Sequence, residues 1–184
     1  MESVEFISHF VLWSVVLLLV LSYLNSPAMK PKEQVLQLQS YGLPVKDQFP
    51  ELQIRSMNNR WLREELDSGK PAIMLFTSAG CSVCNAIYPV VSGFAENHDV
   101  NLLLFVEGNT DAITTKITEH AIRVPVFHAD QETLTHTKVN IFPFAYYVSR
   151  DGTICAKGGI PTGEMLDLLL FEGSYMERML SEAS

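Results

Sequence analysis

The stretch Phe76-Thr77-Ser78-Ala79-Gly80-Cys81-Ser82-Val83-Cys84 joins two different patterns in the sequence. The run before it, Ala72 to Thr77, is short and apolar, which suits a strand buried on both faces. The residues after it repeat at helical spacing, with a predicted apolar face of Ala86, Ile87, Val90, Val91, Phe94 and Ala95. Two cysteines therefore lie between the end of a strand and the start of a helix.

The same alternation continues toward the C-terminus. Strands are predicted at 100–106, 124–127, 144–148 and 153–157, and Arg150-Asp151-Gly152 between the last two is a strong hairpin signal. Helices are predicted around Ile113, Ile117 and Ala121, and after a Thr162 cap. Ser174-x-x-Glu177 is typical of a capping box, which predicts a separate short tail helix. This order predicts an α/β fold with a mixed central sheet flanked by helices.

The N-terminus carries a long apolar segment, with no Asp, Glu, Lys or Arg from Phe6 to Met29. Its length matches the roughly 20 residues that a membrane-spanning helix needs. A core helix would have a polar face, which is absent, and a secretory signal would begin with Lys or Arg. Cleavage after a small-residue site at Ser26-Pro27-Ala28 remains an alternative. We expect an uncleaved transmembrane anchor over 1–29, a linker or entry segment over 30–46, and one domain over 47–184.

Composition narrows the functional classes. The 184 residues carry a formal net charge of −8, which argues against a nucleic-acid partner because such a partner would favour a basic face. Three cysteines do not pair evenly, and two of them form one Cys-x-x-Cys. The cysteines therefore indicate a functional pair plus Cys155, for which a buried structural thiol is the expected role.

Thiol–disulfide exchange needs a thiolate that attacks and a second thiol close enough to resolve the mixed disulfide. Cys81 at a strand end and Cys84 in the first helical turn supply both. The helix terminus is expected to lower the pKa of Cys81 from about 8.5 toward roughly 3.5–7.5. We expect only a moderate lowering, because no Lys, Arg or His lies within the motif; Ser82 is a further hydrogen-bond donor. Cys84 is expected to be buried and slower to react.

Other uses of the pair stay open at this point. Two cysteines three apart can form half of a zinc site, although no second pair at zinc spacing follows. A copper site could recruit His128 or His136. The pair could also have no redox role.

Pro143 lies in Ile141-Phe142-Pro143-Phe144, directly before a predicted strand. A proline inside a central strand would break the ladder, and a cis Phe142–Pro143 bond at the strand entry resolves this conflict. A trans turn proline is the alternative. The cis form would expose the backbone of Phe142 to an extended substrate segment. Pro89, within the helix pattern, is expected to kink that helix.

From about Lys46 to Leu170 the chain resembles membrane-anchored thioredoxin-like thiol–disulfide oxidoreductases of the TlpA/ResA type, and in particular the MauD accessory proteins of methylamine utilisation. The resemblance rests on residues 76–84, on Pro89, on Ile141 to Ala145, and on Asp151 to Gly158 followed by Thr162. It implies a thioredoxin-like fold, a redox-active disulfide at Cys81 and Cys84, and a cis-proline at Pro143. It also implies an N-terminal anchor with the domain on the extracytoplasmic side.

That orientation conflicts with Lys30 and Lys32, which would place the domain in the cytoplasm under the positive-inside rule. Because disulfides persist outside the cytosol, we predict that the domain lies on the extracytoplasmic side. The chain also departs from thioredoxin, which has Trp where this chain has Gly80 and a buried acid where it has Leu75. Glu107 or a water would have to replace that acid.

The sequence therefore predicts an enzyme, a thiol–disulfide oxidoreductase with Cys81 and Cys84 as catalytic residues and Phe142 and Pro143 as substrate-binding residues. No cofactor or metal is assigned. The expected partners are cysteine-containing exported proteins and a membrane redox partner. The alternatives are a copper chaperone of the same fold and a non-catalytic, membrane-tethered assembly factor.

Overall fold

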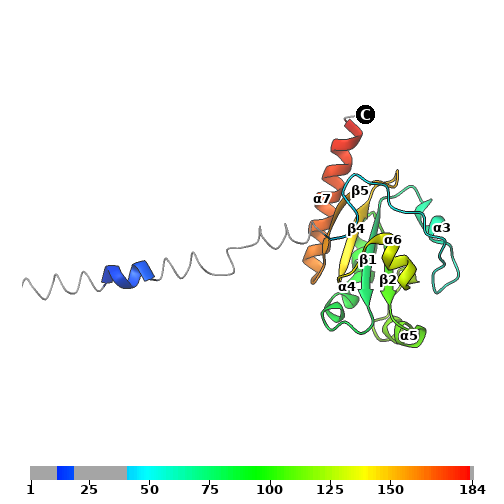
Figure 1. The fold of residues 1–184 in the computed structure, drawn as a ribbon, viewed down its shortest axis with the longest axis horizontal. Coiled ribbons are helices and arrows are strands. Elements are labelled where there is room, and N and C mark those ends of the chain that lie inside the picture. Colours follow the sequence, from blue (N-terminus) through cyan, green and yellow to red (C-terminus); the bar gives the residue numbers. More distant parts are fainter. Residues whose placement is uncertain (1–11, 19–40, 183–184) are drawn as a thin grey trace, which may run out of the picture. The chain divides into compact units, whose positions relative to one another are not determined.

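The computed structural model describes residues 12–18 and 41–182 (Figure 1). Residues 12–18 are helical. The rest of the anchor expected over 1–29, and the entry segment as far as residue 40, lie outside the described residues. Among the residues that are described, no helix combines the length and the apolar character needed to cross a membrane. The chain divides into two compact units, and residues 41–182 belong to the second, which carries the sheet.

The sheet has five strands in the order β3-β2-β1-β4-β5. Its strands are β1 (Ala72–Ser78), β2 (Asn101–Glu107), β3 (Val126–His128), β4 (Phe144–Val148) and β5 (Ile154–Gly159). β1 runs parallel to β2 and antiparallel to β4, so the predicted mixed sheet is confirmed. The hairpin between β4 and β5 also forms where predicted, and its Gly152 adopts a φ of +86°.

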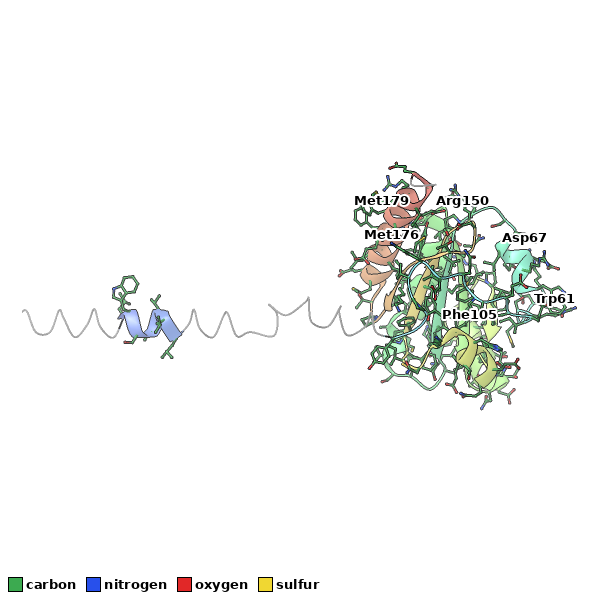
Figure 2. The ribbon with its side chains drawn as sticks, turned by 45° about the horizontal axis from the view of Figure 1, so that its top comes forward. Trp61, Asp67, Phe105, Arg150, Met176 and Met179 are labelled. Carbon is green, nitrogen blue, oxygen red and sulfur yellow. The ribbon has the colours of Figure 1, made fainter. Side chains whose placement is uncertain are left out.

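β1 is central and buried on both faces, which explains its continuous apolar run. Ile73 and Leu75 point into one core, which also holds residues from α4 (Tyr88–Asn97), α5 (Thr110–Glu119) and α7 (Gly163–Glu182). Met74 and Phe76 point into the other core, beside α3 (Leu62–Leu66) and α6 (Gln131–Thr137). Helices therefore flank both faces of the sheet (Figure 1). Figure 2 shows Met176 on α7 and Trp61 at the start of α3, at opposite sides of this domain.

The segment after Cys84 differs from the single kinked helix that was predicted. A 3₁₀ turn (Val83–Ala86) comes first, and α4 then begins at Tyr88 with Pro89 in its first turn. Proline is tolerated there because the amide it lacks would have no partner within the helix. Ile87, Val91 and Phe94 of the predicted apolar face are buried. Val90 of that face is exposed, and Tyr88, which was not predicted, is buried.

Two other helix predictions need correction. α7 runs without interruption from Gly163 to Glu182, so the separate tail helix was wrong: Ser174 Oγ donates to the carbonyl of Phe171 within the same helix. α5 ends at Glu119, and Ala121 lies beyond it with a φ of +48°. Neither α3 nor α6 was predicted from the sequence.

The described end of the entry segment is attached to the sheet. The amide of Leu43 donates to the hydroxyl of Tyr146 over 2.8 Å, and the amide of Lys46 donates to the carbonyl of Ile154 over 2.8 Å. Leu43 and Lys46 are therefore hydrogen-bonded to the domain, which was expected to begin at residue 47.

Candidate active site

The two cysteines of the motif lie together where β1 ends. β1 stops at Ser78, Cys81 is half-buried in the following loop, and Cys84 is buried in the 3₁₀ turn. The amide of Cys84 donates to the sulfur of Cys81 over 3.2 Å. Both side chains are free thiols. The predicted placement of an accessible thiol and a buried one at a strand end is confirmed.

The environment of Cys84 keeps its thiol protonated. Burial raises the pKa of Cys84 to about 12, and hydrogen bonding to Cys81 adds to the rise. Hydrogen bonding to the backbone of Ser78 acts in the opposite direction. At neutral pH Cys84 is therefore a poor nucleophile until a partner removes its proton.

Phe142 and Pro143 lie beside this pair. The Phe142–Pro143 bond is cis, as predicted, and β4 begins at the next residue alongside β1. The sulfur of Cys81 is 3.9 Å from the carbonyl oxygen of Phe142. Pro143 is buried, and its carbonyl accepts from the amide of Ile160 over 3.0 Å. Residues more than 50 positions apart in the sequence thus meet at one end of the inner strands, where β1 stops and β4 begins.

A groove adjoins this end of the strands on the α6 side. It has a volume of about 430 Å³ and is lined by Phe142 and by α6 and the segment after it, including Gln131, Leu134 and Lys138. Polar and apolar residues therefore line this groove together with Phe142.

Three residues at the site carry contacts that the sequence did not predict. Ser78 Oγ donates to a carboxylate oxygen of Glu107 over 2.6 Å, and the hydroxyl of Tyr88 donates to the carbonyl of Ser78 over 3.3 Å. Burial raises the pKa of Tyr88 to about 12, so this hydroxyl remains a donor at neutral pH. Glu107 was proposed from the sequence only as a substitute acid. Tyr88 could have been found from the apolar spacing if the helix had been predicted to start at Tyr88, with Pro89 in its first turn.

Leu75 occupies the position in the middle of β1 where thioredoxin has a buried acid. It is fully buried and pairs with Leu104 on β2 and Ala145 on β4. Glu107 lies at the end of β2 instead, half-buried and in register with Ser78.

The histidines considered for copper lie in exposed positions, His128 at the end of β3 and His136 on α6. Within residues 12–18 and 41–182, no three His, Cys, Asp or Glu side chains form a group that could hold a metal ion. Ser82 is exposed and makes no side-chain cap to the 3₁₀ turn. Cys155 is buried in β5, as expected, and desolvation raises the pKa of its thiol.

The fold of this chain is similar to the folds of several solved structures. A putative thiol:disulfide interchange protein DsbE from Chlorobium tepidum has a TM-score of 0.62 at 15% identity, covering 71% of this chain and 98% of that one. A secreted Mycobacterium tuberculosis disulfide oxidoreductase homologous to Escherichia coli DsbE has a TM-score of 0.56 at 17% identity, covering 67% and 95%. The fold is therefore thioredoxin-like.

By sequence, the chain is similar to one group of proteins, the MauD proteins. The methylamine utilization protein MauD of Paracoccus versutus is 23% identical over 130 residues, which are 71% of this chain and 66% of that protein. For other MauD proteins the matched stretch spans about half of their length. No family model matches the chain. The resemblance to thioredoxin-like oxidoreductases and to MauD, expected from the sequence, is thereby confirmed.

Proposed function

We propose that the chain is a thiol–disulfide oxidoreductase in which Cys81 is the nucleophile and Cys84 the resolving thiol. The observation that carries the proposal is the placement of the Cys81 sulfur, 3.2 Å from the amide of Cys84 and 3.9 Å from the carbonyl of Phe142. The amide of Cys84 thereby fixes the Cys81 sulfur next to the residue that would resolve the mixed disulfide. The buried and protonated Cys84 suits a group that acts second.

In the reducing direction, the Cys81 thiolate attacks one sulfur of a client disulfide. A Cys81–client disulfide forms, and the other client sulfur leaves as a thiolate. Cys84 then gives up its proton to the released client thiolate and attacks the Cys81 sulfur. The Cys81–Cys84 disulfide forms, the second client sulfur leaves as a thiolate, and two electrons have passed to the client. The oxidising direction is the reverse, and a membrane dithiol or disulfide partner would reset the pair.

The client is proposed to bind as an extended segment at Phe142 and Pro143. The Phe142 carbonyl faces the reactive sulfur, so a client amide that donates to this oxygen would bring its own cysteine next to Cys81. The groove lined by Phe142, Leu134 and Lys138 would take neighbouring client side chains.

The proposed clients are exported proteins, as the likeness to a secreted oxidoreductase and to MauD suggests. The apolar segment from Phe6 to Met29 would tether the domain to the membrane on its extracytoplasmic side. A membrane-impermeant maleimide tests this orientation. A single new cysteine after Lys32, in a variant without the native cysteines, should be labelled in intact cells. Labelling only after lysis would reverse the orientation.

Turnover of a disulfide substrate tests the activity itself. The purified protein should reduce insulin with dithiothreitol as electron source, and Cys81→Ser should abolish the increment over dithiothreitol alone. A wild-type rate equal to the dithiothreitol background would contradict catalysis and favour an assembly factor that uses the fold for binding. Copper titration of the reduced protein separates the copper chaperone, for which wild type but not Cys81→Ser would bind the ion tightly.

A further inference from the structure

Ser78 is the residue where the contacts of the site meet. Its hydroxyl donates to Glu107 over 2.6 Å and accepts from the amide of Gly80 over 3.3 Å. Its carbonyl accepts from the amide of Cys81 over 3.1 Å and from the hydroxyl of Tyr88 over 3.3 Å. The side chain and the carbonyl of Ser78 therefore tie the loop that carries Cys81 to β2 and to α4.

Glu107 holds the same loop from the neighbouring strand. Its carbonyl accepts from the amide of Ala79 over 2.8 Å, while its carboxylate accepts from Ser78. The following residue, Gly108, has a φ of +141°, and a Cβ there would lie 3.0 Å from the Cβ of Ala79. The end of β2 thus packs closely against the loop and grips it through main chain and side chain together.

We propose that Ser78 and Glu107 are positioning residues for the exchange reaction, acting as a pair that fixes the Cys81 loop for attack on the client disulfide. Neither residue touches the client in this account. The inference rests on the proposed function for its reaction, and its evidence is the set of contacts at Ser78.

The geometry gives a reason why the hydroxyl matters to the rate. Thiol–disulfide exchange needs the attacking sulfur in line with the two client sulfurs, and misplacing a reacting group by about 1 Å can cost roughly 10²-fold in rate. Without the Ser78 hydroxyl the Gly80 amide loses its acceptor, directly before Cys81. The Glu107 carboxylate loses its donor at the same time. The loop would then keep its main-chain bonds and the bond from the Tyr88 hydroxyl to the Ser78 carbonyl.

The experiment compares Ser78→Ala, Glu107→Ala and the double variant in two assays. One is insulin reduction, and the other is the pH profile of Cys81 alkylation by iodoacetamide. We expect Ser78→Ala to lose about tenfold in kcat/KM and Glu107→Ala to lose no more than that, because Ser78→Ala also removes the acceptor of the Gly80 amide. The double variant should be no worse than Ser78→Ala, because Glu107→Ala removes a bond that Ser78→Ala has already removed. The rate of Cys81 alkylation across the pH profile should change by the same factor in Ser78→Ala and in the double variant. Glu107→Gln and Ser78→Thr keep an acceptor and a hydroxyl, and each should recover most of the rate.

Ser92→Ala is the matched control. Ser92 is a buried serine on α4 whose hydroxyl accepts from the amide of Arg123 over 2.9 Å, so this variant also loses one buried hydroxyl bond. It should lower the melting temperature and leave both assays unchanged. Additive losses in the double variant, or a wild-type rate and profile in Ser78→Ala, would overturn the inference. If wild type itself reduces no insulin, the proposed function fails, and the alkylation profile of Cys81 still tests the pair.

Discussion

The carbonyl oxygen of Phe142 lies 3.9 Å from the sulfur of Cys81, although the two residues are 61 positions apart in the sequence. The contact arises because β4 pairs antiparallel with β1, with Phe144 opposite Phe76, so the residues just before β4 face the loop just after β1. A backbone acceptor is thereby held beside a half-buried thiol. This arrangement supports a site for an extended segment that carries its own sulfur.

The difference between the three cysteines predicts selective alkylation of the native protein. Cys84 and Cys155 are both buried, and burial raises the pKa of both thiols, whereas Cys81 is partly accessible. Brief treatment of the reduced protein with iodoacetamide at pH 8 should give one adduct, on Cys81. Treatment in urea should give three. Mass spectrometry of the digested protein locates the adduct, and a native adduct on Cys155 would contradict the burial of that thiol.

Two helical glycines should respond in opposite directions to alanine. A Cβ at Gly173 on α7 would lie 2.2 Å from the ring of Tyr147, so Gly173→Ala should destabilise the fold by about 1–3 kcal/mol or more. A Cβ at Gly93 on α4 would meet nothing within 4 Å, so Gly93→Ala should stabilise by roughly 0.5–1 kcal/mol. Urea denaturation measures both. Equal effects of the two substitutions would show that α7 does not pack on β4 as described.

The cap of α6 should make stability depend on acid pH. Asp130 accepts from the amide of Thr133 over 2.8 Å, and hydrogen bonds from Thr133 lower the pKa of its carboxyl. A pKa lowered by folding adds stability that is present above the unfolded value, about 3.9, and is lost as the pH falls through the folded value. Asp130→Ala should therefore cost about 1 kcal/mol at pH 7. It should cost much less once the pH has fallen below the lowered pKa of the folded carboxyl.

Asp130→Asn is the control for that prediction, because asparagine caps a helix without ionising. It should retain most of the stability at pH 7 and show a weaker acid dependence than wild type. Denaturation curves collected from pH 2 to pH 7 compare the three proteins. A cost of Asp130→Ala that stays constant over this range would rule out the carboxylate as the cap.

The elements that a local pattern determines were predictable from sequence. The apolar runs gave β1, β2 and β4 to within one or two residues, and Asp151-Gly152 marked the hairpin. α6 was missed because Gln131–Thr137 has one large apolar residue, Leu134, and buries Thr133 and Thr137 instead. A helix that buries threonines has no apolar stripe to detect.

Some residues of the candidate site could be predicted from local sequence, and others could not. Cys81, Cys84 and Pro143 were found because a cysteine pair and a proline before a strand are local signals with a physical meaning. The bond between Ser78 and Glu107 depends on the register of β1 against β2, which pairs these two residues across 29 positions of sequence. No local pattern specifies a register, so the partner of Ser78 could be found only in the folded structure.

Trapping of a mixed disulfide tests the central claim most directly. Cys84→Ser removes the resolving thiol, so a client attacked by Cys81 should remain attached, and mass spectrometry of the cross-linked peptides should find Cys81 in the bond. Cys81→Ser should trap nothing, and neither should the double variant. Mixed disulfides formed through Cys84 or Cys155 in these variants, or none with Cys84→Ser, would contradict the assignment of Cys81 as nucleophile.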